Sequence, residues 1–126
     1  VAISHKKNKG VISLCHMSAP EAKVSYELKI ENRLKKRQLY QLFLDWAISG
    51  NVDGIIVGAT YPKIISYCKK SIHGKLSIFS PGVGTQGGSA SKAKKLGSDY
   101  LIIGRTILNS KHPVQTAKDL VVDTLI

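Results

Sequence analysis

Acidic residues, cysteines and long hydrophobic runs are all scarce in this sequence. Eight Asp and Glu stand against nineteen Lys and Arg in 126 residues, a formal net charge of +11. This balance excludes an acidic disordered tail and favours an anionic partner. The two cysteines, Cys15 and Cys68, lie far apart without a CxxC pair, so no disulfide framework or zinc site is predicted and a reducing, cytoplasmic setting is expected. Because no apolar run approaches about eighteen residues and no charged-then-apolar leader occurs, neither a membrane span nor a secretory signal is predicted.

Four short apolar runs predict strands. They occupy residues 11–15, 54–58, 76–79 and 100–103. Each is rich in Val, Ile or Leu without regular polar alternation, which is typical of strands covered on both faces, as in parallel sheets.

Helical patterns follow these runs. Apolar residues recur with helical spacing over residues 39–47, with Gly50 as a stop, and further helices are expected over 62–70, over 90–96 after a Ser89 cap, and from Pro113 onward. Repeated alternation of strand and helix predicts an α/β fold with parallel strands and right-handed crossovers. Such a chain forms either an open doubly wound sheet or half of an eight-stranded barrel, since a complete barrel takes about 250 residues.

The strongest candidate for a binding loop follows the third predicted strand. Residues 80–88 read Ser-Pro-Gly-Val-Gly-Thr-Gln-Gly-Gly and lead directly into a predicted helix. Glycines let bare backbone N–H groups approach an anion, and Gln86 adds the loop's one long amide. The alternative is an ordinary strand-to-helix connection, although nine residues exceed what such a turn needs.

Two further segments are placed at the same end of the predicted sheet. Gly104 and Arg105 follow the fourth strand, and a guanidinium there suits bidentate contact with a phosphate, although a solvated surface charge is the alternative. Ser18 follows the first strand as a small polar contact, or as a turn residue before Pro20. Thr60 is expected to cap the helix that begins at Pro62.

The remaining polar residues favour less specific roles. The four histidines, His5, His16, His73 and His112, have no metal-ligand spacing, so solvated or capping roles are expected. Residues 23–37 are strongly basic; they fit a solvated helix face, as in lysine-rich thermophile proteins, or a patch for an acidic partner, better than a nucleic-acid surface.

Several motifs together resemble orotidine 5′-monophosphate decarboxylase, especially its archaeal forms. Residues 80–88 and the later Ile-Gly-Arg-Thr of residues 103–106 are similar to the end of that family's barrel. The Met-Ser-Ala-Pro of residues 17–20 is similar to the loop after its fifth strand, and residues 53–62 to its sixth strand and loop. The resemblance runs from about Gly10 to the C-terminus. Ala19 and Glu21 depart from the family's frequent His and Gly.

The resemblance implies a TIM (β/α)8 barrel, of which this chain supplies strands five to eight. Residues 1–9 would be the tail of the fourth helix. The fifth to eighth βα units would then be residues 10–50 (with the basic insertion), 51–75, 76–98 and 99–126.

The resemblance also implies a nucleotide site in which Gln86 and Arg105 hold the phosphate and Ser18 contacts the pyrimidine ring. The expected substrate-binding residues are Ser18, Pro81, Gly82, Val83, Gly84, Thr85, Gln86, Gly87, Gly88, Gly104 and Arg105. The family converts orotidine 5′-monophosphate to uridine 5′-monophosphate in pyrimidine biosynthesis without metal or cofactor. We therefore expect those nucleotides as ligands, no cofactor, and a homodimer of complete barrels.

The family's catalytic signature, D-x-K-x-x-D, is absent from these 126 residues. Together with the half-barrel length and a start at Val1, this predicts a fragment that is inactive without an N-terminal half, with open sheet edges that invite pairing. Two alternatives remain: a related sugar-phosphate enzyme (a 3-keto-sugar-phosphate decarboxylase or hexulose-phosphate synthase), and a basic module that binds nucleic acid.

Overall fold

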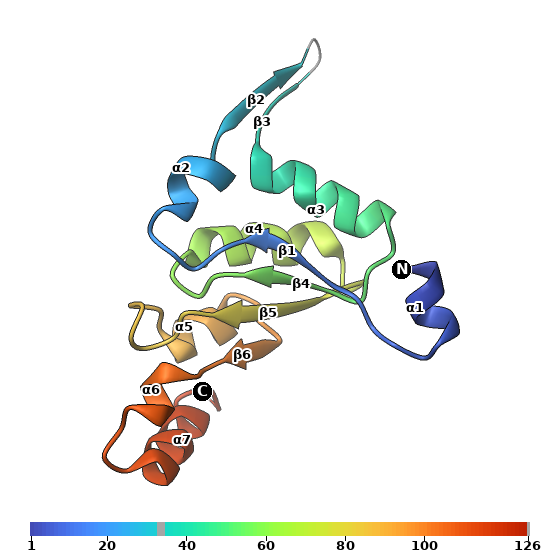
Figure 1. Ribbon diagram of the computed structural model, residues 1–126. Helices are drawn as coiled ribbons and strands as arrows, with labels where there is room; N and C mark the ends of the chain where they lie inside the picture. Colours follow the sequence, from blue (N-terminus) through green and yellow to red (C-terminus); the bar gives the residue numbers. More distant parts are fainter. Residues whose placement is uncertain (33–34, 126) are drawn as a thin grey trace.

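The main sheet has four parallel strands, as the sequence predicts. The computed structural model describes residues 1–32 and 35–125 (Figure 1). The strands are β1 (Ile12–His16), β4 (Gly54–Val57), β5 (Ser77–Pro81) and β6 (Tyr100–Ile102), in the order β1-β4-β5-β6. The third strand extends two residues beyond its predicted end, to Pro81. The α/β prediction with parallel pairing is confirmed.

Helices precede, connect and follow these strands. They are α1 (Ala2–Lys6), α3 (Leu39–Ser49), α4 (Pro62–Ile72), α5 (Ala90–Lys95), α6 (Arg105–Leu108) and α7 (Pro113–Val122). Ser89 caps α5 as predicted, since its Oγ accepts the Lys92 N–H at 3.2 Å. Gln38 and Gln41 cap α3 reciprocally, which the sequence analysis did not anticipate.

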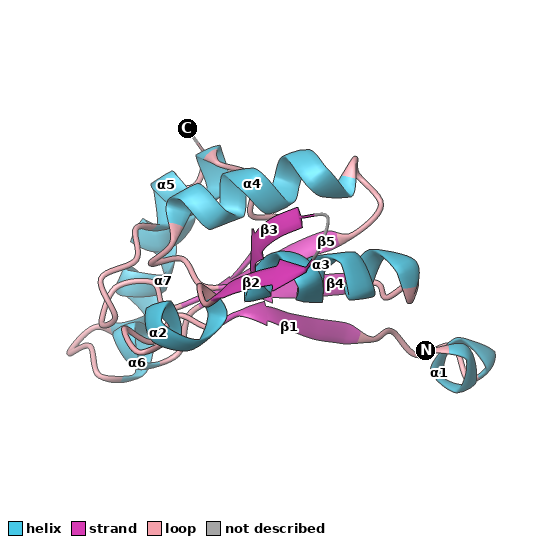
Figure 2. Ribbon diagram, turned by 90° about the horizontal axis from the view of Figure 1, so that it is seen from above, coloured by secondary structure: helices cyan, strands magenta, loops and turns pink. Residues whose placement is uncertain are grey.

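The hydrophobic core lies between one face of the sheet and helices α3, α4 and α5. Figure 2 shows α4 and α5 along one side of the strands. Ile55, Val57 and Ile78 from the strands are completely buried there, against Leu44 of α3 and Ile65 of α4. This layer makes up half of the sheet-and-helix arrangement that a barrel repeats around its axis.

The opposite face of the sheet is uncovered. Along it Leu14 pairs with Ile56, Ile56 with Phe79, and Phe79 with Tyr100, and the last two rings stack at 4.8 Å between centroids. Leu14 and Tyr100 are 42% and 55% exposed. Gly54 leaves room for this row, because a Cβ there would lie 2.6 Å from Phe79 Cε2.

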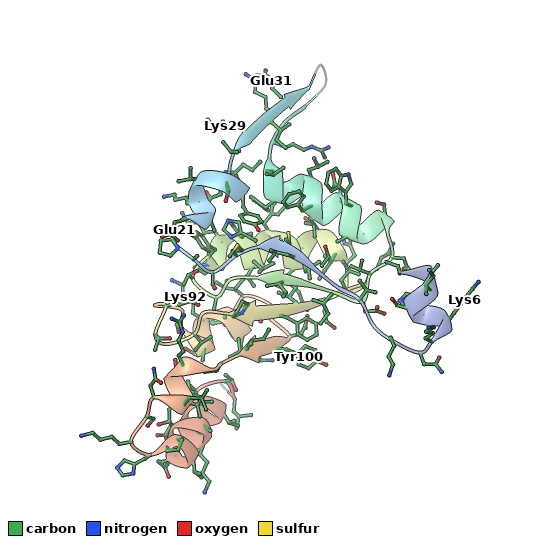
Figure 3. The ribbon with its side chains drawn as sticks, viewed as in Figure 1. Lys6, Glu21, Lys29, Glu31, Lys92 and Tyr100 are labelled. Carbon is green, nitrogen blue, oxygen red and sulfur yellow. The ribbon has the colours of Figure 1, made fainter. Side chains whose placement is uncertain are left out.

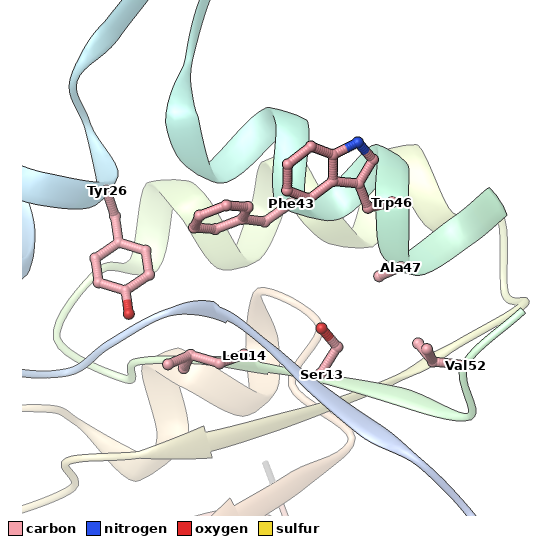
Figure 4. Close-up of a pocket in the computed structure, with 7 residues that line it drawn as sticks. All are labelled: Ser13, Leu14, Tyr26, Phe43, Trp46, Ala47 and Val52. Atoms are coloured by element: carbon pink, nitrogen blue, oxygen red, sulfur yellow. The ribbon is translucent and has the colours of Figure 1, made fainter. Parts of the chain in front are cut away.

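Both edge strands of the main sheet are also open. Strands β1 and β6 each have one neighbour in the main sheet. Beside β1, a groove separates that strand from α3; Figure 4 shows Phe43 and Trp46 of α3 on one side of it and Leu14 on the other. The expected open edges are therefore present in this chain.

The basic segment, residues 23–37, does not form one solvated helix face, contrary to the expectation. It forms the short helix α2 (Ala22–Tyr26) and an antiparallel hairpin of β2 (Lys29–Asn32) and β3 (Lys35–Gln38). The hairpin projects from the rest of the molecule, with Lys29 and Glu31 on it (Figure 3). An ion pair between Glu31 and Lys36, 3.1 Å apart, joins its strands.

In the described residues, no helix has the length and apolar character to cross a membrane.

Candidate functional site

The loops that follow β1, β4, β5 and β6 lie at one end of the sheet, opposite α1 (Figure 1). The carboxyl ends of parallel strands necessarily share this end, which is where α/β folds and barrels bind ligands. The predicted binding residues all belong to these loops or to the strand ends beside them.

The glycine-rich loop closes on itself through backbone hydrogen bonds. Gly84 N–H donates to Gly88 O at 2.9 Å, Gly87 N–H to Gly84 O at 2.7 Å, and Gly88 N–H to Gly82 O at 3.0 Å. Gly82, Gly84 and Gly87 have φ of 92°, 76° and 86°, in the region that L side chains rarely adopt. The loop is thus a shaped structure, which a plain strand-to-helix turn does not require.

Ser18 and Gln86 meet across two loops. Ser18 Oγ donates to Gln86 Oε1 at 3.0 Å, although 68 positions separate the residues. Gly82 permits this contact, since a Cβ at that position would lie 2.6 Å from Ser18 Cβ and 3.0 Å from Gln86 Oε1. The sequence analysis placed both side chains at this end, and the structure brings them together.

Thr106 joins the glycine-rich loop to the start of α6. Its Oγ1 donates to Val83 O at 2.8 Å and accepts the Thr85 N–H at 3.1 Å. A Cβ on Gly84 would clash with Thr106, lying 2.3 Å from Oγ1. Sequence reasoning included Thr106 in a motif without a role, because a hydrogen bond between two loops has no local sequence pattern.

Arg105, the neighbour of Thr106, is exposed on the first turn of α6, after Gly104. Within residues 1–32 and 35–125 its guanidinium has no hydrogen bond or ion pair to the chain. The glycine-rich loop and Arg105 are thereby linked through Thr106. A cation, the Gln86 side-chain amide and the Gln86 backbone N–H, which makes no hydrogen bond within the described residues, are available at one end of the sheet. These groups suit a phosphate.

The loop after β1 is fixed by three consecutive carbonyl groups. His16 Nδ1 lies 2.8 Å from Met17 O, Thr60 Oγ1 donates to Ser18 O at 2.9 Å, and Tyr61 Oη donates to Ala19 O at 2.9 Å. Thr60 therefore holds this loop and does not cap α4, for which Tyr61 is the N-cap residue. That expectation was wrong because a threonine two residues before a proline matches an N-cap pattern whichever partner its hydroxyl finds.

Gly58 allows the loops after β1 and β4 to pack together. A Cβ on Gly58 would lie 2.5 Å from Ser18 Cα and 2.8 Å from Met17 O. Gly58 N–H also donates to His16 O at 3.0 Å, continuing the strand pairing to its end.

His16 is completely buried, so the expected solvated or capping role was wrong. A β-bulge causes this: Leu14 pairs with Ile56, and the next residue in register is His16, opposite Val57. The extra residue turns both Cys15 and His16 toward the helices. Burial lowers the pKa of His16 below its ordinary value, while the Met17 carbonyl and Glu27 act in the opposite direction.

Cysteine and tyrosine groups near this strand are also buried. Burial raises the pKa of Tyr40 to about 12. The pKa of Cys68 is raised by its contact with Cys15 and by burial, and both buried thiols behave as small hydrophobic side chains. Among the described residues, no group of three or more His, Cys, Asp or Glu side chains comes together to hold a metal.

Comparison with known proteins agrees with the resemblance. The model of the orotidine 5'-phosphate decarboxylase / HUMPS family matches residues 2–120. The chain belongs to this family.

Curated relatives of the chain include archaeal proteins named orotidine 5'-phosphate decarboxylase. The chain is 34% identical to that of Pyrococcus furiosus over 110 residues, which are 87% of this chain and 47% of the relative. It is 35% identical to that of Pyrococcus horikoshii over 108 residues, 86% of this chain and 47% of the relative. This chain therefore spans about half the length of those proteins.

Solved structures of such enzymes share the fold. The orotidine 5'-monophosphate decarboxylase from Methanocaldococcus jannaschii, complexed with the inhibitor BMP, aligns with a TM-score of 0.82 and 26% identity over 98% of this chain and 53% of that one. The enzyme from Sulfolobus solfataricus gives 0.78 and 25%, over 99% and 54%. The predicted fold of the archaeal-type decarboxylase barrels is confirmed, and this chain covers about half of each of these barrel chains.

Proposed function

We propose that this chain forms the phosphate- and nucleotide-binding half of an orotidine 5′-monophosphate decarboxylase, which becomes active when an N-terminal half completes the barrel. The observation that carries the proposal is the junction of Ser18, Gln86 and the glycine-rich loop at the carboxyl ends of the strands. Family membership and the names of the relatives supply the reaction.

The chemistry of the loops suits a nucleotide monophosphate. The Gln86 backbone N–H, which makes no hydrogen bond within the described residues, supplies a donor for the phosphate, as does the Gln86 side-chain amide, and the Arg105 guanidinium adds positive charge. Ser18, which bonds to Gln86 Oε1, would contact the pyrimidine ring. Binding energy at the phosphate, remote from the bond that breaks, can contribute to the transition state when the barrel is complete.

The chemical step needs groups outside this half. In the family, a lysine protonates the carbon that loses CO2, and carboxylates orient that lysine and act on the departing group. The five aspartates of this chain are Asp45, Asp53, Asp99, Asp119 and Asp123, and none begins D-x-K-x-x-D. Turnover by the proposed enzyme therefore requires an N-terminal half that carries this motif.

A complementation assay tests the proposal. The chain is mixed with the N-terminal half of the Pyrococcus furiosus relative, and conversion of orotidine 5′-monophosphate to uridine 5′-monophosphate is measured. We expect turnover from the mixture and none from either half alone. In the mixture, Gln86→Ala and Arg105→Ala are each expected to raise KM about 10- to 100-fold, the loss of a hydrogen bond to a charged group.

A matched control and two opposing outcomes complete that experiment. Lys111→Ala removes an exposed cation just after α6 and should leave KM unchanged. Metal-dependent turnover of a hexulose phosphate in place of the nucleotide would support the sugar-phosphate alternative. Steeply salt-dependent binding of nucleic acid by the chain, indifferent to Gln86 and Arg105, would support the nucleic-acid alternative.

A further inference from the structure

A histidine with no direct part in the proposed nucleotide contacts lies immediately behind the Ser18 loop. The rings of Tyr26, Tyr40 and Tyr61 surround the buried His16 ring at centroid distances of 5.3, 5.9 and 4.3 Å. Burying a polar ring is costly unless its nitrogens are hydrogen-bonded, so the partner of each nitrogen matters.

The contact at Nδ1 fixes which nitrogen carries the hydrogen. His16 Nδ1 lies 2.8 Å from Met17 O, and a carbonyl oxygen only accepts, so Nδ1 must be the donor. This hydrogen bond holds the peptide group between Met17 and Ser18. Ser18 in turn donates to Gln86, so His16 supports the junction of the two loops from behind.

The contact at Nε2 is incomplete. In the neutral ring Nε2 has a lone pair, and it faces Glu27 Oε1 at 3.6 Å. Two acceptors cannot form a hydrogen bond, and Nε2 has no hydrogen-bond partner in the described part of the chain. A proton on Nε2 would make the contact an ion pair, whose favoured length is about 2.7–2.9 Å. The ring and the carboxylate must then move toward each other.

Glu27 is the charged group that faces this ring. The other titratable groups against it are Tyr26 of α2, Tyr40 at the start of α3 and Tyr61 before α4. Burial raises the pKa of Tyr40 to about 12 and raises that of Tyr61 above its ordinary value, so neither ionises when His16 titrates. Glu27 follows directly after α2, and movement there involves the basic insertion.

We propose that His16 is a positioning residue of the nucleotide site: its ring holds the Ser18 loop in place, and protonation draws the ring toward Glu27 and displaces the loop that it holds. The inference rests on the proposed function, because it takes Ser18 and Gln86 to face the nucleotide. It assigns a role to a residue that touches neither substrate nor reacting atoms. It also connects the basic insertion, through Glu27, to the loop that contains Ser18.

Steady-state kinetics of the complete barrel test the proposal between about pH 5 and 8, where histidine titrates. His16→Phe keeps an aromatic ring but removes both nitrogens; we expect KM to rise about fivefold with kcat unchanged, the value of one hydrogen bond. His16→Asn keeps an amide N–H near the Nδ1 position and should retain the wild-type KM near pH 7.5, within the range where the ring is neutral. The rise of KM toward acid pH should be steeper in the wild type than in His16→Asn. Glu27→Gln should make this rise of KM shallower than in the wild type.

The control is His73→Asn, an exposed histidine after α4 whose positive φ of 47° asparagine also tolerates; it should match the wild type throughout. A wild-type KM in His16→Phe, or equal acid profiles in the wild type and His16→Asn, would overturn the inference. Should His16→Phe fail to fold, the comparison of acid profiles alone decides.

Hydrogen exchange separates this inference from the proposed function. In the chain without nucleotide, the backbone amides of residues 17–19 should exchange faster in His16→Phe than in the wild type or His16→Asn. Equal exchange rates in these variants would refute the proposal that His16 holds the Ser18 loop, whether or not the complete barrel is active. A complete wild-type barrel with no turnover of orotidine 5′-monophosphate refutes the proposed function, while the exchange rates still test His16.

Discussion

The two faces of the main sheet carry similar apolar side chains in opposite environments. Ile55 and Ile78 on the helix-covered face are completely buried, whereas Ile12 and Ile102 on the other face are 48% and 47% exposed. Apolar burial contributes roughly 25 cal/mol per Å², so the stability of this chain comes chiefly from one face. Parallel sheets are ordinarily covered on both faces. The comparison teaches that apolar side chains suit a strand to burial on both faces, whereas the burial itself requires a layer that covers each face.

Truncating one residue on each face gives the largest expected effect. Ile78→Ala should lower the free energy of unfolding by about 2–5 kcal/mol, because it leaves a cavity in the core. Ile102→Ala, the matched change on the uncovered face, should cost less than about 1 kcal/mol in this chain. Urea unfolding monitored by circular dichroism measures both. Equal losses would contradict the distinction between the faces.

A charge on the uncovered face tests whether that face becomes buried when an N-terminal half associates with the chain. Leu14→Asp should leave the stability of the chain nearly unchanged, since Leu14 is 42% exposed. It should weaken association with an N-terminal half about 100-fold, because closure of the barrel would bury an unpaired carboxylate. Titration of one labelled half with the other measures this Kd. Asn8→Asp, the same charge change at an exposed site after α1, should have no effect.

Weakening the helical cover should have a smaller effect. Ser89 caps α5, whose Ala90 and Ala93 are buried in the core. Ser89→Ala should cost about 1 kcal/mol of unfolding free energy, measured as a shift in the urea midpoint. Ser71→Ala serves as its control, because Ser71 bonds back to Tyr67 O within α4 and caps no helix N-terminus. A loss from Ser71→Ala as large as that from Ser89→Ala would argue against the cap.

The smallest effect concerns pH. Because burial lowers the pKa of His16, the folded chain favours the neutral ring, while the unfolded chain takes up a proton near the ordinary value of about 6.5. Stability from this residue is therefore present above about pH 6.5 and is lost as the pH falls through the lower pKa of the folded state. Unfolding curves measured at several pH values should show this loss. His16→Asn should lose less stability on acidification, and an identical loss would exclude His16 as its source.

The sequence predicts the main sheet well because the strands of this sheet have a simple local signature. Short apolar runs, each followed by Gly, Ser or Pro, located all four strands, and the order of the loops placed Ser18, Gln86 and Arg105 at one end. The core of Ile55, Val57 and Ile78 follows from the same runs.

The parts that sequence reasoning missed depend on contacts between distant residues. The β-bulge that buries His16 is defined by pairing with Val57, which no local pattern reveals. Thr60 and Thr106 act on carbonyls of other loops, at Ser18 and Val83. The hairpin escaped prediction because residues 29–38 are lysine-rich and alternate only briefly, so their strand signal was weak.

The order of strands in the main sheet bears on how the chain acquires its structure. In that sheet every hydrogen-bonded pair joins strands that follow one another along the chain, with the hairpin set aside. No pairing must wait for a segment from the far end of the sequence; the connections that close are residues 17–53, 58–76 and 82–99, and the entropic cost of closure grows only slowly with loop length. Because each parallel pairing must close a crossover connection first, the sheet should still form more slowly than a bundle of helices with mostly local contacts. Such a chain can assemble stepwise as it leaves the ribosome, β1 receiving β4 and each later strand joining the last one formed, so that the exposed edge β6 is the last part of the sheet to appear.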